Sequence, residues 1–143
     1  MPLRARTKTA CEIARIDPQR FNEMIHAGHY NCAPETRPGS ARIFDLDQIV
    51  ALRIFGKLIS MAVSPDRAGH IACAAYSQFS GRDDVRSMVY MVMRNGAWHM
   101  IMRTKTDTDD LPEFCMVFDI PGLRDEITEH LEYEDKNRVV GED

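Results

Sequence analysis

The stretch RPGSARIFDLDQIV, from Arg37 to Val50, changes character in its middle. Its first half holds a proline, a glycine and a serine between two arginines, a composition that turns the chain. Its second half starts with Asp45, a good N-terminal helix cap, and continues with apolar residues at helical spacing. The stretch therefore predicts a cationic turn that leads through a short extended segment, residues 41–46, into a helix that begins at Leu46.

The helix from Leu46 is predicted to continue to about Met61 and to be apolar on two sides. Two groups of large apolar residues follow helical spacing along it: Leu46, Ile49 and Val50, then Leu52, Phe55 and Ile59. A helix with two apolar sides lies between two packing partners. Ser64-Pro65 predicts the start of a further helix, to about Phe79, because a serine cap precedes a proline suited to the first turn. Its expected core residues are Ala68, Ile71, Ala72 and Ala75.

Two short helices are predicted before the cationic turn. The capping-box pattern that starts at Thr9 predicts a helix over residues 10–15. The Asp-Pro pair at residues 17–18 joins an N-cap to a first-turn proline and predicts a second helix, which Gly28 ends. Only a residue or two separate the helices, so a helix-turn-helix geometry is expected.

The second helix is predicted to present long hydrogen-bonding side chains outward. Phe21, Met24 and Ile25 take its core positions, which leaves outside Gln19, Arg20, Asn22, Glu23 and His26. Such side chains suit contacts with base edges and phosphates, and a solvated amphipathic face is the alternative interpretation. Residues 29–40 are predicted to form an extended arm and turn, because two prolines and a glycine disfavour regular helix there.

The periodicity changes from helical to alternating after residues 80–84. Asn95-Gly96 is a strong hairpin signal and predicts three cross-strand pairs: Met93 with Trp98, Met91 with Met100, and Val89 with Met102. A third strand is expected over residues 113–120. Pro121-Gly122 is then expected to turn the chain into an acidic helix over residues 123–134.

Charge is distributed unevenly along the 143 residues, whose net charge is -4. Residues 1–80 carry ten Lys/Arg and seven Asp/Glu (+3), and residues 81–143 carry eight and fifteen (-7). This asymmetry suggests that the basic part faces a polyanion. No apolar run approaches the about 20 residues of a membrane span, and the basic N-terminus lacks the apolar region of a secretory signal. A cytoplasmic location is therefore expected.

The sequence holds no pattern typical of catalysis or metal binding. The cysteines Cys11, Cys32, Cys73 and Cys115 contain no C-x-x-C pair, so they are expected to be small buried hydrophobes. The five histidines are dispersed, and the acidic run Asp107, Asp109 and Asp110 lacks the glycine and distal glutamate of a calcium loop. We therefore expect no enzyme, no cofactor and no metal, and the sequence names no small-molecule effector.

The order of these elements resembles the winged helix-turn-helix of MerR-type transcription regulators. The matching segments are residues 9–16, 17–28, 39–44, 45–58 and 64–71, about half of the chain. The chain departs from the family in its second helix, in the two residues between Gly39 and Arg42, and in having no long coiled coil after the fourth helix. The resemblance implies an α+β protein with a winged helix-turn-helix domain over residues 1–80. A small domain over residues 81–143, with a β-hairpin, a strand and a helix, would serve dimerisation or sensing.

The resemblance also implies a site for double-stranded DNA. Gln19 and Arg20 would contact bases in the major groove, with Asn22 and Glu23 on the same outward face. Contacts with the DNA backbone or the minor groove would come from Thr9, Arg37, Ser40 and Arg42, while Phe44 anchors the wing inward. The expected function is a sequence-specific transcriptional regulator that binds a palindromic operator as a homodimer. The alternatives are an excisionase-like architectural DNA-binding protein and a protein-interaction module that works through the acidic C-terminal half.

Overall fold

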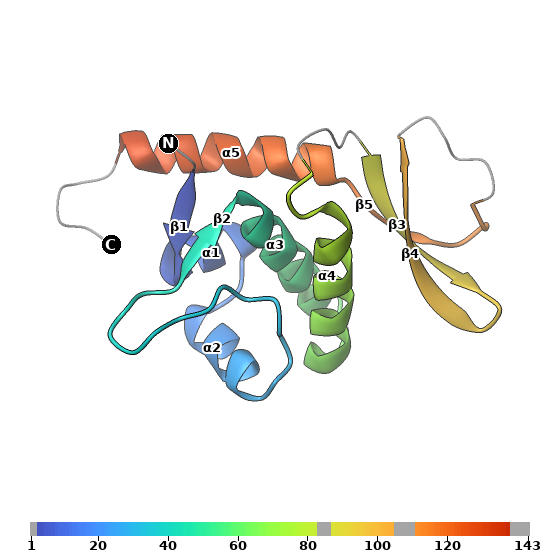
Figure 1. The fold of residues 1–143 in the computed structure, drawn as a ribbon, viewed down its shortest axis with the longest axis horizontal. Coiled ribbons are helices and arrows are strands. Elements are labelled where there is room, and N and C mark those ends of the chain that lie inside the picture. Colours follow the sequence, from blue (N-terminus) through green and yellow to red (C-terminus); the bar gives the residue numbers. More distant parts are fainter. Residues whose placement is uncertain (1–2, 83–86, 105–110, 138–143) are drawn as a thin grey trace.

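The chain forms an α+β fold with five helices and two small antiparallel sheets in the residues that its computed structural model describes, 3–82, 87–104 and 111–137 (Figure 1). The elements are, in chain order, β1 (Arg4–Arg6), α1 (Thr7–Ala14), α2 (Pro18–His26), β2 (Ile43–Asp45), α3 (Leu46–Ser60), α4 (Pro65–Phe79), β3 (Ser87–Arg94), β4 (Ala97–Thr104), β5 (Met116–Phe118) and α5 (Ile120–Lys136). The acidic run at residues 107–110 lies outside the described residues.

The start of α1 differs from the capping-box prediction. The helix begins at Thr7, no side chain caps it, and Thr9 lies inside its first turn. The reason is a strand that the sequence did not predict: β1 pairs with β2, with Ala5 opposite Phe44, and the chain enters α1 directly from this ladder. The paired strand therefore sets the helix start, and the Thr9 side chain does not.

The predicted limits of α2 and α3 are confirmed, because local caps determine both. The Asp17 carboxylate accepts a hydrogen bond of 2.9 Å from the Arg20 N–H at the start of α2. Asp45 and Gln48 form a reciprocal capping box at the start of α3. The prediction that α3 is apolar on two sides is also confirmed, because its buried residues surround most of the helix. It packs against α1, α4 and α5.

The predicted helix α4 is confirmed, with Ala68, Ala72 and Ala75 buried and Ile71 partly buried. The β3–β4 register is also confirmed: Met93 pairs with Trp98 across a turn in which Asn95 and Gly96 both have positive φ. β3 lies in the middle of the second sheet, between β4 and β5.

The end of the chain differs from the prediction. β5 has three residues instead of the eight expected, and α5 begins at Ile120. Pro121 and Gly122 do not form a separate turn but lie in the first turn of α5, where Asp119 accepts a 3.0 Å hydrogen bond from the Gly122 N–H. A Cβ at residue 122 would stand 2.4 Å from an Asp119 carboxylate oxygen, so the glycine makes room for this cap. In the sequence alone, Pro121-Gly122 reads as a turn, although Gly122 is there to accommodate the Asp119 cap.

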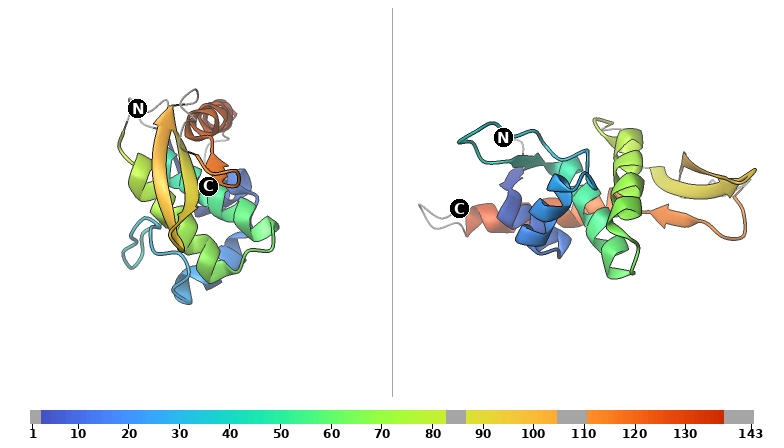
Figure 2. Two further views of the ribbon diagram at one scale, coloured as in Figure 1. Left: turned by 90° about the vertical axis from the view of Figure 1, so that its right-hand side faces the viewer. Right: turned by 90° about the horizontal axis from the view of Figure 1, so that it is seen from below.

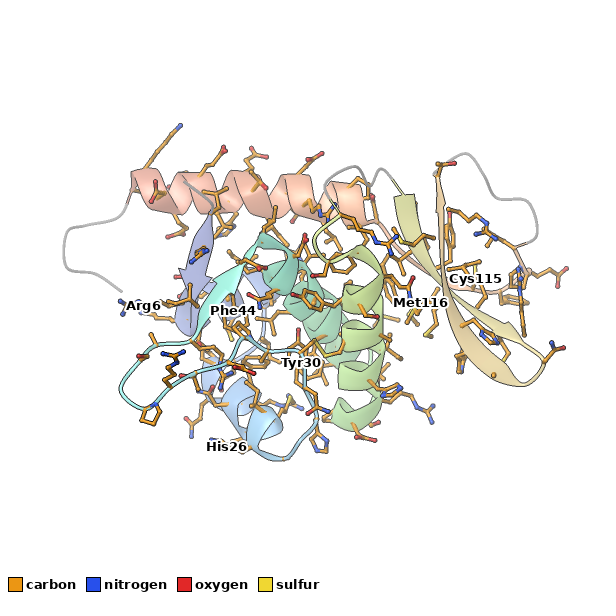
Figure 3. The ribbon with its side chains drawn as sticks, viewed as in Figure 1. Arg6, His26, Tyr30, Phe44, Cys115 and Met116 are labelled. Carbon is orange, nitrogen blue, oxygen red and sulfur yellow. A yellow bond between two sulfur atoms is a disulfide. The ribbon has the colours of Figure 1, made fainter. Side chains whose placement is uncertain are left out.

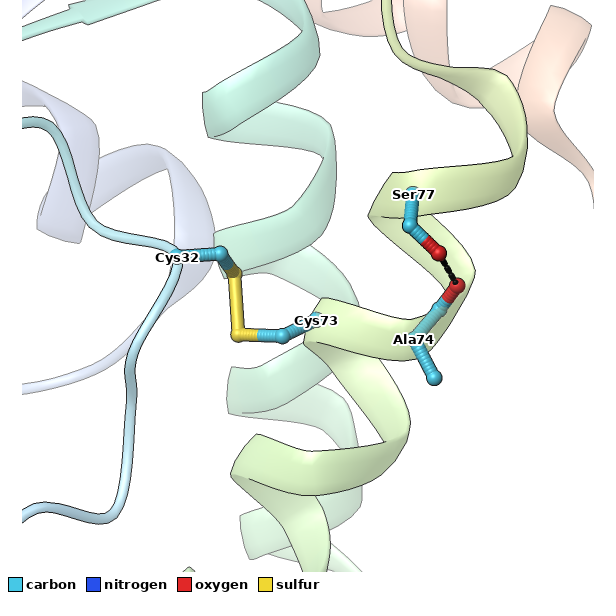
Figure 4. The surroundings of a disulfide bond; sticks show 4 residues. All are labelled: Cys32, Cys73, Ala74 and Ser77. Atoms are coloured by element: carbon cyan, nitrogen blue, oxygen red, sulfur yellow. Dashed lines mark hydrogen bonds between the residues drawn. A yellow bond between two sulfur atoms is a disulfide. The ribbon is translucent and has the colours of Figure 1, made fainter.

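The cysteine prediction is correct for Cys11, which is fully buried, and wrong for the other three. Cys32 and Cys73 form a disulfide with their Cα atoms 5.5 Å apart (Figure 4). Cys115 is exposed. The two bonded residues are 41 positions apart and meet because the segment after α2 packs against α4. Disulfides persist mainly in oxidising surroundings, so this bond was not expected for a protein in the cytoplasm.

The segments before and after residue 80 contribute to one apolar core. Ile120, Ile127 and Leu131 of α5 and Val89 and Met91 of β3 belong to the same buried cluster as the residues of α1 to α4. Figures 1 and 2 show α5 running along one edge of the helical part and the β3–β4 hairpin extending from one end. No helix among the described residues is both long and apolar enough to cross a membrane.

Candidate nucleic-acid interface

The outward side of α2 carries a continuous stripe of polar side chains. Residues i, i+3, i+4 and i+7 of a helix share one face, and in α2 these positions are Gln19, Asn22, Glu23 and His26. All four are exposed, and the opposite face buries Phe21 and Met24. The stripe offers amide, carboxylate and imidazole groups, which are the groups that read base edges by hydrogen bonding.

Arg20 lies beside this stripe rather than on it. It stands four positions before the buried Met24, so its Cβ lies at the border between the outward and the core-facing sides. Its backbone N–H is used by the Asp17 cap, whereas its side chain is exposed. A long guanidinium at this border can reach a phosphate or a base beside the stripe.

Residues 27–42, here called the arm, connect α2 to β2 without regular secondary structure, as predicted. The start of the arm is fixed by Tyr30, which is 2% exposed and packs with ring centroids 5.3 Å from Phe21 and 4.8 Å from Phe55. Backbone packing adds to this, because a Cβ at residue 69 would stand 1.5 Å from the His29 carbonyl oxygen. The arm therefore starts from a rigid base on α4, where Cys73 also holds it.

The tip of the arm is an exposed turn that contains Arg37 and Ser40. The Ser40 N–H donates to the Arg37 carbonyl at 3.0 Å, and the Thr36 hydroxyl donates to the Ser40 carbonyl at 2.9 Å. Gly39 adopts a φ of +79°, which a glycine adopts without strain. The Arg37 side chain is exposed, as an outward phosphate contact requires.

Arg42 does not extend outward as predicted. Its side chain is half-buried and its guanidinium donates to the Pro34 carbonyl, across the arm. An arginine close to a free carbonyl gains a charge-assisted hydrogen bond, so Arg42 braces the arm. The prediction for Phe44 is confirmed, because this ring is fully buried 6.1 Å from Phe21.

The structure gathers most of the eight predicted DNA-contacting residues on one side of the molecule. Gln19, Arg20, Asn22 and Glu23 lie on α2, and Arg37 and Ser40 lie at the tip of the neighbouring arm. Figure 1 shows α2 and the arm next to each other on the side opposite to α5, and Figure 3 shows His26 at this outer edge. Thr9 is partly buried in α1 and Arg42 lies at the root of the arm.

Two exposed cations of β1, Arg4 and Arg6, were not predicted from the sequence. Both are exposed, while Ala5 between them is 5% exposed and belongs to the core. The signal was present in the alternation of Arg-Ala-Arg, which is the pattern of a half-buried strand. A three-residue strand is too short for periodicity alone to reveal it.

The described residues offer no alternative site with obvious chemistry. They contain no group of three or more His, Cys, Asp or Glu side chains that could hold a metal ion. Burial, and to a lesser degree the charge of Asp17, raises the pKa of the Cys11 thiol to about 12. A neutral buried thiol is a poor nucleophile. A groove of about 630 Å³ lies between α3 and the start of α5, lined mainly by apolar residues such as Leu58, Met61 and Met116.

The sequence of this chain was compared with protein-family models and with curated proteins. No family model matches the chain, and no curated protein sequence matches it.

Proposed function

We propose that this chain is a sequence-specific DNA-binding regulator of transcription that uses a MerR-like winged helix-turn-helix. In this proposal α1 and α2 form the helix pair, and α2 enters the major groove. The arm, returned to the core by β2, acts as the wing. The observation that carries the proposal is the exposed stripe on α2 beside an arm with an outward arginine at its tip.

Three properties of the stripe support base reading over simple solvation. Gln19 and Asn22 carry amides, which can bond bidentately to adenine in the major groove. Glu23 can accept from the cytosine amino group, and it follows these amides on the same face. The helix itself is held by a cap and by a buried aromatic cluster, so its outward side chains project from a rigid scaffold.

We propose further that the protein works as a homodimer on a palindromic operator. One α2 helix of nine residues reads only a few base pairs, so specific recognition of an operator requires two half-sites. Residues 81–143 would supply dimerisation or sensing. Their described elements pack on α3 and α4, which leaves α2 and the arm exposed.

The test is selection of bound duplexes from a random DNA pool, followed by titration at several salt concentrations. We expect one enriched motif with two-fold symmetry and half-sites about one helical turn apart. Gln19→Ala should relax the preference at one base pair by about 1–3 kcal/mol. Glu132→Gln, on the exposed side of α5, is the control and should leave the preference unchanged. A pool that shows no enrichment would reject the proposal.

An interaction module is the second candidate, and the outward side of α5 favours it. This helix exposes several carboxylates, among them Asp125, Glu129 and Glu132, together with Tyr133, which is 64% exposed. A carboxylate-rich face with an exposed aromatic suits a basic protein partner. If selection finds no motif and alanine at Gln19 and Arg37 leaves function intact, the working surface is α5.

A further inference from the structure

We infer that β1 is a second phosphate-contacting element and that its arginines, Arg4 and Arg6, extend the proposed DNA surface beyond α2 and the arm. This inference rests on the proposed function. It names the DNA backbone, and not the bases, as the group that β1 contacts. Its first support is the way in which the fold orients the two side chains.

The register of β1 forces both arginines outward. Ala5 pairs with Phe44 on the inner face of the ladder, where both are buried. Because side chains alternate along a strand, Arg4 and Arg6 share the opposite, exposed face. A slip of one residue would bury two guanidinium groups and expose Ala5, so the core fixes this orientation.

The β1 cations have no partner among the described parts of the chain. Neither guanidinium forms a hydrogen bond or an ion pair there. Asp45 stands across the ladder from Arg4, but its carboxylate accepts a 2.8 Å hydrogen bond from the Gln48 N–H as the cap of α3. The run from residue 3 to residue 8, LRARTK, contains three cations and no acid. Like charges so close together favour an external anion.

The place of β1 in the fold selects the DNA backbone as that anion. Arg6 pairs with Ile43, the residue that follows Arg42 at the root of the arm. Figure 3 shows Arg6 at the end of the molecule to which the loop of the arm extends, so β1 adds its two cations beside the arm. Contacts between these arginines and phosphates do not distinguish one base from another, so we expect their contribution to affinity to be independent of the DNA sequence.

The measurement is the salt dependence of operator binding by Arg6→Gln and by the double variant Arg4→Gln/Arg6→Gln. Each lost phosphate contact lowers the slope of log K against log salt by about 0.9. We expect a decrease of about one for the single variant and about two for the double, with the selected motif unchanged. Both side chains are exposed and without described partners, so the thermal midpoint should stay the same.

Arg94→Gln, in the β3–β4 hairpin at the end of the molecule opposite to the arm (Figure 1), removes one positive charge away from the proposed surface and should keep the slope of the unaltered protein. A slope equal to that of the unaltered protein in both β1 variants, with intact specific binding, would overturn the role of β1 alone. An unaltered protein that binds no DNA at moderate salt would overturn the inference together with the proposed function. A change in the selected motif would also overturn it, because β1 would then contact bases.

Discussion

At the residue scale, Arg37 and Arg42 show that two arginines of the same loop can have different roles. Arg37 lies in the exposed turn at the arm tip, whereas Arg42 is half-buried and donates to the Pro34 carbonyl. A guanidinium already bonded to the protein has less to offer a phosphate, because binding DNA would require it to give up that bond. The outward role belongs to Arg37 and the bracing role to Arg42.

We predict different effects for the two substitutions. Arg37→Gln should lower the salt slope of DNA binding by about one and leave the free energy of unfolding unchanged, because it removes one exposed phosphate contact. Arg42→Gln should instead lower the free energy of unfolding by about 1–2 kcal/mol, because it weakens a hydrogen bond from a charged donor. Urea unfolding and binding titrations of the same preparations separate the two effects. The roles are reversed if Arg42→Gln alone changes the slope.

Helix ends are set by different means at the element scale. Side chains cap α2, α3 and α5, whereas α1 follows β1 directly and the Ser64 side chain makes no cap hydrogen bond at the start of α4. Ser64 therefore occupies an N-cap position without capping its helix, whereas the three aspartates Asp17, Asp45 and Asp119 each cap theirs. α3 has the most complete cap, since its box satisfies donors in both directions.

We predict that Asp45→Ala costs about 1 kcal/mol of unfolding free energy, because it leaves the Gln48 N–H at the start of α3 without its partner. Ser64→Ala is the matched control on α4 and should change the unfolding free energy by less than about 0.5 kcal/mol. Urea denaturation followed by circular dichroism measures both. Equal losses in the two variants would contradict the assignment of the caps.

The Cys32–Cys73 disulfide also stabilises the arrangement of elements, because it joins the arm to α4. It closes a loop of 41 residues, for which chain entropy predicts a stabilisation of about 3–4 kcal/mol. The double variant Cys32→Ser/Cys73→Ser should lose this amount, and dithiothreitol should have the same effect on the unaltered protein. Cys115→Ser, which changes an exposed free thiol, should have no effect. Mass spectrometry without reductant should find Cys32 and Cys73 in one linked peptide pair.

At the scale of the whole molecule, α5 packs back against α3 and joins the end of the chain to the N-terminal helices. The Arg124 guanidinium lies 2.9 Å from the Asp47 carboxylate, with side chains 14% and 17% exposed. It also donates to the carbonyls of Phe79 and Arg82, and its charge stands 5.7 Å from the Phe79 ring centroid. One side chain thus links α5 to α3 and to the end of α4.

We predict that Arg124→Ala lowers the free energy of unfolding by about 2–4 kcal/mol, because it leaves the nearly buried Asp47 carboxylate without its charged partner. Glu126→Ala removes a more exposed ion pair, with Arg53, and should cost at most about 1 kcal/mol. Differential scanning calorimetry should record one transition in both variants, because the segments before and after residue 80 share a core. Two separate transitions would contradict this shared core.

The sequence by itself determined the features that depend on neighbours along the chain. Asp17-Pro18, the Asp45 box and Asn95-Gly96 each place a cap or a turn through bonds within a few residues, so α2, the start of α3 and the hairpin register were predictable. The outward stripe of α2 followed in the same way, because helical spacing and the buried Phe21 dictate it.

Only the tertiary structure decided what depends on distant partners. β1 exists because Phe44 offers Ala5 a place in the core, and this pairing moved the start of α1 away from Thr9. Arg42 turned inward because Pro34 came within reach, and Cys32 met Cys73 because the arm packs on α4. Local patterns encode hydrogen bonds between near residues, whereas the partner of a strand, a guanidinium or a thiol is chosen by the packing of the whole chain.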